Sequence, residues 1–239
     1  MCSVSRTRKD LAHRSLCLAL VMIAWIGTSA QDTGTNAGHE PSAIAMPESR
    51  SADSYRIYAR AMPLGETGGR GWPNKLWLVQ DTTVVTVAPN EPCQGPASPK
   101  DDLFARTKNP HFAVRPSQDR KQDFAEILED WDLHCHDRVK LDPNAWHTTV
   151  PVLLLDANAQ ARYGHSRSGG KFNAEADPYE GAPALYAFSM VYFNRAHTVA
   201  LLYATHYCGS LCGQGFWLAF AFEDGNWKPL GWKSLGWIS

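Results

Sequence analysis

Four apolar residues in the middle of the chain recur at the spacing of one helical face. They lie at i, i+3, i+4 and i+7: Phe124, Ile127, Leu128 and Trp131. Acidic residues fill the positions between them, as expected for an amphipathic helix with one buried side. Ser117 precedes this run as a candidate N-cap, and Asp119 is favourable in the first turn. The pattern predicts a helix that follows Ser117.

A second helical pattern lies nearer the amino terminus. Its apolar positions are Tyr55, Tyr58, Ala59 and Met62, with Ser51, Asp53 or Ser54 as alternative caps. Pro63 and Gly65 follow at once, and neither residue favours the continuation of a helix. We predict that this helix opens the folded domain near Asp53.

Three runs in the last third of the chain are apolar at nearly every position. They are Leu185–Phe193, Val199–Tyr207 and Phe216–Phe222. Strands that are apolar on both faces belong to a sheet that is covered on both sides. Polar turns separate them at Asn194–His197 and Glu223–Asn226, where Gly225 suits a positive φ. We predict an antiparallel meander, with Trp227–Ile238 as its fourth element.

Shorter segments add to this sheet. Leu76–Val79 and Thr82–Val87 are rich in β-branched and aromatic residues. Val150–Leu155 is an apolar run in which Pro151 indicates an edge strand or a strand start. Asp156 is placed to cap a short helical turn that ends near Gly164. The expected fold class is α+β: a mainly antiparallel sheet packed with two or three amphipathic helices, in one domain over residues 53–239.

Three segments show neither the apolar spacing of a helix nor the pattern of a strand. Residues 31–52 are small and polar and predict a flexible leader before the domain. Residues 89–116 contain repeated prolines, which cannot donate to a β-ladder, so we expect a surface excursion there. Residues 164–183 are rich in glycine and predict a loop.

The first thirty residues have the order of a secretory signal. Basic residues come first, an apolar run from Leu16 to Ile26 follows, and small residues lead to Ala30. The run is 11 residues long, whereas a membrane-spanning helix needs about 20. We predict that residues 1–30 are a cleaved signal peptide and that the protein is periplasmic or secreted. Retention of this segment as an anchor is the alternative.

The charge of the chain is nearly balanced, with 23 basic and 24 acidic residues. Binding to nucleic acid phosphates requires clustered Lys and Arg, and no such cluster stands out. We therefore do not expect nucleic acid as a partner. An envelope protein or an envelope glycan is the partner class that fits an exported chain.

The cysteines beyond the leader are Cys93, Cys135, Cys208 and Cys212. An even number in an exported chain predicts two disulfides, for which three pairings exist. We favour Cys208–Cys212 and Cys93–Cys135, because the first pair is held close by its own glycine-rich turn.

The carboxyl-terminal meander resembles an uncharacterised family of exported bacterial proteins. The resemblance is carried by Phe188–Asn194, Ala200–Tyr203, the Cys-Gly-x-Leu-Cys-Gly-x-Gly turn at 208–215 and Asp224–Lys228. Val79–Thr83 is similar to a segment of that family in which a strand ends in Asp-x-Thr. The resemblance implies export and this architecture, and it implies no activity.

Two alternatives involve the chemistry of these cysteines and histidines. Cys208 with His206 has the residue types of a thiol nucleophile and its base, as in a Cys-dependent hydrolase or a thiol oxidoreductase. A zinc site is the other alternative, with ligands drawn from His134, His136, His206, Cys208 and Cys212.

No catalytic set in the sequence is complete. The leading hypothesis is therefore a non-catalytic exported protein that binds a partner in the cell envelope or has a structural role there. We expect it to need no cofactor.

Overall fold

The structure, a computed structural model, describes residues 42–64, 75–95, 103–168, 179, 181–209, 212–231, 233–234 and 236–238. The predicted signal peptide and the first part of the predicted leader lie outside these residues. The elements, in chain order, are β1 (Ile44–Ala45), α1 (Glu48–Leu64), β2 (Trp77–Gln80), α2 (Leu103–Lys108), α3 (Pro110–Ala113), β3 (Val114–Arg115), a 3-10 turn (Gln118–Arg120), α4 (Lys121–His134), β4 (Val139–Lys140), β5 (Val152–Leu155), α5 (Ala157–Ser168), β6 (Leu185–Phe193), β7 (Val199–Gly209), β8 (Cys212–Glu223), β9 (Asn226–Leu230), β10 (Lys233–Ser234) and β11 (Trp237–Ile238).

The main sheet has the strand order β11-β8-β7-β6-β2-β5, and β9 also pairs with β8. Strands β6 to β9 form the predicted antiparallel meander, which confirms the α+β class. The sheet is nevertheless mixed, because β2 lies parallel to both β5 and β6. Long connections through α4 and α5 return the chain to the same end of the sheet, as parallel pairing requires.

Strand β6 carries a bulge that keeps its apolar residues on the correct faces. Phe188 pairs with Ala204 and Val191 with Leu202, so one extra residue is inserted on β6. Ser189 fills the bulge, and its Oγ accepts a hydrogen bond from the Tyr203 N–H at 3.0 Å. Without the extra residue, Val191 would point to the opposite face.

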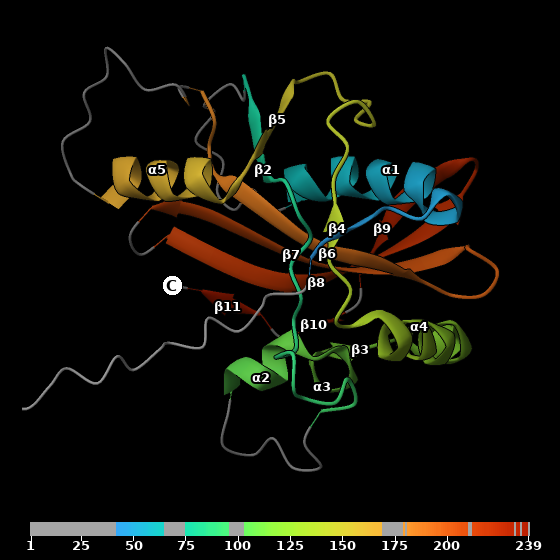
Figure 1. Cartoon of the computed structure of the whole chain (residues 1–239). Coiled ribbons are helices and arrows are strands. Elements are labelled where there is room, and N and C mark those ends of the chain that lie inside the picture. The colour runs from blue at the N-terminus through green and yellow to red at the C-terminus, as the bar shows by residue number, and fades with distance from the viewer. Residues whose placement is uncertain are drawn as a thin grey trace, which may run out of the picture. The chain divides into compact units, whose positions relative to one another are not determined.

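The sheet is covered on both faces, as the unbroken apolar strands predict. One face packs against α1 through Tyr58, Phe188 and Phe220, among others. The other packs against α4 through Ile127, Trp131 and other apolar residues. Figure 1 shows α1 and α4 on opposite sides of the sheet. A third cluster joins α5 to β2 and β5.

Helix α4 confirms the apolar pattern from which it was predicted. Phe124, Ile127 and Trp131 are buried, and Leu128 is half-buried against the same cluster. The chain enters α4 through the 3-10 turn, whose N-cap position is Ser117. The Ser117 side chain makes no capping hydrogen bond to this turn. The cap at Asp156 is confirmed, because its Oδ1 accepts the Ala159 N–H at 2.7 Å.

The prediction of a strand at Thr82–Val87 is wrong. Its backbone groups bond to two different elements: the Thr83 N–H donates to Val139 O and the Val84 N–H to Phe188 O. The segment therefore leaves β2 and crosses to β4 and the β6 bulge instead of extending a single ladder. A β-branched sequence suits such a half-buried crossing as well as it suits a strand.

The boundaries of the three unpatterned segments also need correction. The leader is shorter than predicted, because β1 pairs with β4 and α1 begins at Glu48. The proline-rich segment contains α2, α3 and β3, and β3 pairs with β10. Helix α5 continues to Ser168, so the predicted loop does not begin at Gly164. The predicted fourth element of the meander is divided into β9, β10 and β11.

Candidate functional site

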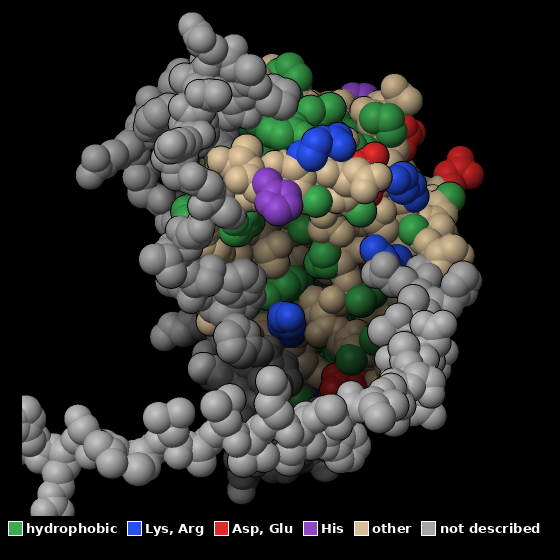
Figure 2. All heavy atoms as spheres, turned by 60° about the vertical axis from the view of Figure 1, so that its left-hand side comes forward, with side chains coloured by type: hydrophobic (Ala, Val, Ile, Leu, Met, Phe, Trp, Pro, Cys, Tyr) green, Lys and Arg blue, Asp and Glu red, His purple; other side chains and the backbone are tan. Residues whose placement is uncertain are grey.

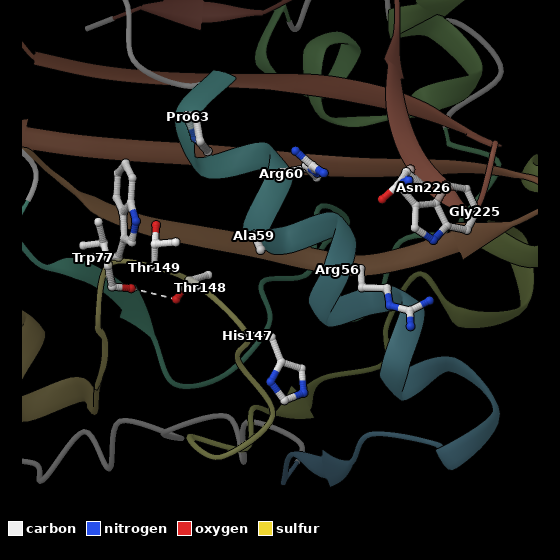
Figure 3. A pocket seen from close by; sticks show the side chains of 12 residues that line it. Arg56, Ala59, Arg60, Pro63, Trp77, His147, Thr148, Thr149, Gly225 and Asn226 are labelled. Carbon is white, nitrogen blue, oxygen red and sulfur yellow. Dashed lines mark hydrogen bonds between the residues drawn. The ribbon is translucent and has the colours of Figure 1, made fainter.

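A cavity of about 530 Å³ lies beside the exposed side of α1. Its other walls are the 147–150 connection that leads into β5 and the turn between β8 and β9. The residues that matter for its chemistry are Arg56, Arg60, Trp77, His147, Asn226 and Trp227. Figure 3 shows these side chains around the cavity, with His147 on the segment that faces the helix. This volume is within the range of small-molecule sites, about 300–1,000 Å³.

Helix α1 positions two arginines at the cavity because its opposite side is buried. Tyr58, Ala61 and Met62 pack into the core with 1% or less exposure. Arg56 and Arg60 are four residues apart, so they lie one turn apart on the exposed side. Figure 3 shows both projecting from the helix that borders the cavity.

The two arginines differ in their partners. The Nη1 of Arg56 lies 3.6 Å from Asp53 Oδ1, a distance at which the pair is loose. Asp53 Oδ1 also accepts the indole N–H of Trp227 at 3.0 Å, which fixes one wall of the cavity. Among the described residues, Arg60 has no ion-pair partner. Its guanidinium is thus available to an incoming anion.

The remaining walls are formed by polar residues where the cavity opens to solvent and by two buried tryptophans further inside. Trp77 and Trp227 are 6% and 3% exposed, respectively. His147 and Thr149 are exposed, and the Thr148 hydroxyl donates to Val150 O at 2.7 Å, which folds the connection back on itself. No Asp or Glu side chain is among the described residues that line the cavity. The site therefore favours an anionic group, for which Arg is the best bidentate donor.

One face of the molecule carries side chains of mixed character. On the face shown in Figure 2, described basic, acidic and apolar side chains are interspersed.

The predicted thiol site does not contain a free thiol. Cys208 is bonded to Cys212, with a Cα–Cα distance of 5.2 Å. His206 lies two residues before Cys208 on β7 and is buried between the rings of Tyr186 and Phe216. This burial lowers the pKa of His206 below its usual value. The structure thus presents a disulfide beside a neutral imidazole.

The structure does not bring the five predicted zinc ligands together. His134 is the last residue of α4 and His136 follows the helix, whereas His206, Cys208 and Cys212 belong to the β7–β8 hairpin. His134 is already paired, with its Nδ1 2.7 Å from Asp137 Oδ2. Within the described ranges, the group of three metal-ligand residue types that does gather is Cys93, Cys135 and His136. Of this group, His136 alone belongs to the alternative ligand set named from the sequence.

The second disulfide joins Cys93 to Cys135, as the favoured pairing predicts, with a Cα–Cα distance of 5.8 Å. It ties the segment after Thr82–Val87 to the carboxyl end of α4. Cys135 is 1% exposed and belongs to the cluster beneath the sheet.

Sequence reasoning missed the cavity. The spacing of Arg56 and Arg60 was a usable signal, since it places two cations on the exposed side of a predicted helix. The other walls carried no such signal, because 147–150 and the β8–β9 turn meet α1 only through the tertiary fold.

No protein-family model, curated protein or solved structure matches this chain. In the part of the chain that the structure describes, no helix has the length and apolar character needed to cross a membrane.

Proposed function

We propose that this chain is an exported, non-catalytic binding protein that holds an anionic ligand in the cavity beside α1. The ligand carries a carboxylate or phosphate on a small cyclic or branched body. The observation that supports this most directly is the presence of two arginines, Arg56 and Arg60, on a cavity that no described Asp or Glu lines. Within the described ranges, Arg60 forms no ion pair. In the cell envelope, acidic sugars and their phosphate esters have this chemistry.

Export is supported by two independent features. The first thirty residues have the order of a signal peptide. The structure also forms two disulfides from the four cysteines beyond that segment, and such bonds persist in oxidising compartments.

Binding is favoured over thiol catalysis because the attacking group is unavailable. A thiol nucleophile acts as its thiolate, whereas the Sγ of Cys208 is bonded to that of Cys212. Thiol catalysis would therefore require the disulfide to be open in the purified protein.

Isothermal titration calorimetry tests this proposal. The probes are glucuronate, N-acetylmuramate and inorganic phosphate, with glucose as the neutral match of glucuronate. We expect at least one anion to bind and glucose not to bind. Arg60→Gln should raise the Kd of that anion at least tenfold, a loss of about 1.4 kcal/mol that is typical of one charged hydrogen bond.

Arg195→Gln is the matched control, because Arg195 is an exposed arginine of the β6–β7 turn that pairs with Glu129 of α4 and does not line the cavity. Its Kd should equal that of the unmodified protein. Failure of all three anions to bind, or equal affinities in both variants, would reject the proposal. Turnover of an ester or peptide substrate that Cys208→Ala abolishes would establish the thiol enzyme instead.

A further inference from the structure

Two cysteines and one histidine converge at the carboxyl end of α4. The Sγ atoms of Cys93 and Cys135 and a ring nitrogen of His136 all lie within 4.8 Å of one another. In the folded chain the two sulfurs are bonded as a disulfide. Two thiolates and an imidazole are the ligand types of a zinc site.

The histidine of this group has an unused nitrogen. The Nδ1 of His136 is buried from solvent and has no hydrogen-bond partner in the structure. A buried polar atom without a partner destabilises the folded state. A metal ion bound at this nitrogen would remove that deficit.

The two sulfur atoms are held in place by more than their own bond. Cys135 follows α4 directly as its C-cap residue and packs with the cluster beneath the sheet. The carbonyl of Cys93 accepts a hydrogen bond from Asn109 Nδ2 at 3.0 Å. Asn109 is itself fixed as the N-cap of α3, where its Oδ1 accepts the His111 N–H. These contacts restrain both cysteines when the disulfide is open.

The backbone spacing suits a metal as well as a disulfide. The Cα atoms of Cys93 and Cys135 are 5.8 Å apart. Tetrahedral zinc with Zn–S bonds of about 2.3 Å places two sulfurs roughly 3.8 Å apart. Rotation of the two cysteine side chains gives that separation without movement of the backbone.

We propose that the reduced chain has a zinc site formed by Cys93, Cys135 and His136, and that this site and the Cys93–Cys135 disulfide exclude each other. A dithiol reductant breaks the S–S bond, becomes a cyclic disulfide itself and delivers two electrons and two protons to the cysteines. Zn²⁺ then displaces the two thiol protons and accepts the His136 nitrogen as its third protein ligand. Water takes the fourth position, as in other sites with three protein ligands. This proposal is independent of the anion cavity.

The test uses the full chain with Cys2, Cys17, Cys208 and Cys212 each replaced by Ser, so that only Cys93 and Cys135 contribute thiols. This protein is reduced with a phosphine, freed of reductant under argon and titrated with Co²⁺ and Zn²⁺. We expect one Co²⁺ per chain, with the near-ultraviolet charge-transfer absorption of two thiolate ligands. Zn²⁺ should displace it stoichiometrically.

His136→Ala in the same background should weaken Co²⁺ binding at least tenfold and change the visible absorption of the complex. His165→Ala is the control, because His165 is exposed on α5 and distant in sequence from the cluster. Its titration should match the parent. The unreduced protein should bind no Co²⁺ with this absorption.

Circular dichroism with and without Zn²⁺ covers the case in which reduction unfolds the chain. Metal-dependent refolding would support the site, since such sites couple binding to folding. The proposal is overturned if the reduced chain remains unfolded with Zn²⁺, if it binds no metal stoichiometrically, or if His136→Ala binds Co²⁺ as tightly as the control.

Discussion

His206 is a buried titratable side chain that should make the stability of the protein depend on pH. It is 8% exposed on β7, its Nδ1 has no hydrogen-bond partner among the described residues, and its ring lies between Tyr186 and Phe216. Burial disfavours the charged imidazolium and so lowers the pKa of His206 from its usual 6.5. In the unfolded chain the same group takes up a proton at higher pH.

Stability should therefore fall as the pH decreases below about 6.5, where the unfolded chain binds a proton that the folded chain does not. The contribution of His206 is complete above that pH. His206→Phe, which cannot titrate, should flatten the dependence of the unfolding free energy on pH between 7.5 and 5.5. Urea unfolding at several pH values measures this slope. His165→Gln, at an exposed position, should leave it unchanged, and equal slopes in the two variants would contradict the assignment.

The residue scale also shows what the sequence could and could not reveal about the candidate site. The pairing of Cys208 with Cys212 was predictable, because the two cysteines are four positions apart in the sequence and the turn between them keeps them close. The exposure of Arg60 followed from the apolar positions on the other side of its helix. That His147 lines the cavity was not predictable, because only the tertiary fold brings the 147–150 segment next to α1.

At the scale of elements, long periodic segments were predicted well and short ones poorly. The three central strands of the meander and α4 contain enough apolar residues for one pattern to dominate. Thr82–Val87 has the composition of a strand, but its hydrogen bonds go to two partners that lie far away in sequence. Gly164 was interpreted as a helix end, yet α5 continues through it to Ser168. The cost of one helical glycine, about 1 kcal/mol, was too small to stop the helix.

One ion pair joins three of these elements. Arg50 on α1 and Asp130 on α4 form a bidentate pair with N–O distances of 2.8 and 2.5 Å, and each side chain is about 15% exposed. Asp130 Oδ2 also accepts the Phe193 N–H of β6 at 2.9 Å. The hydrogen bonds that the Asp130 carboxylate accepts from Arg50 raise the pKa of Arg50 above its usual value. The pair thus links the helices on opposite sides of the sheet to an interior strand.

Asp130→Ala should lower the unfolding free energy by about 3 kcal/mol, because it removes the carboxylate partner of a largely buried guanidinium and leaves the Phe193 N–H without its acceptor. Asp130→Asn should cost less, since its amide oxygen can still accept the Phe193 N–H. Glu129→Ala is the control one residue away: Glu129 pairs with Arg195 at an exposed position, and such pairs contribute under about 1 kcal/mol. Urea denaturation compares the three variants, and equal losses for Asp130→Ala and Glu129→Ala would show that the pair is not a structural link.

At the scale of the whole molecule, the two disulfides constrain the unfolded chain to very different extents. Cys208–Cys212 closes a separation of 4 residues within one hairpin, whereas Cys93–Cys135 spans 42 residues and encloses α2, α3 and α4. Loop-closure entropy increases with the logarithm of loop length. The longer bond therefore removes more freedom from the unfolded state, and it ties the irregular proline-rich segment to the core.

Replacing Cys93 and Cys135 by alanine should thus lower the unfolding free energy by about 4 kcal/mol, against about 2 kcal/mol for Cys208→Ala with Cys212→Ala. Linear extrapolation from urea unfolding under non-reducing conditions measures both losses. Loss of the Cys93–Cys135 disulfide should also increase protease cleavage within residues 82–120, because this segment loses its covalent bond to the carboxyl end of α4. Loss of the Cys208–Cys212 disulfide should leave cleavage there unchanged. A larger loss of unfolding free energy for Cys208→Ala with Cys212→Ala would mean that the short disulfide stabilises the protein through packing or relief of strain. The loop-entropy model includes neither of these. In that case the β7–β8 hairpin, rather than the segment joined to α4, would be the part of the molecule whose stability depends most on oxidation.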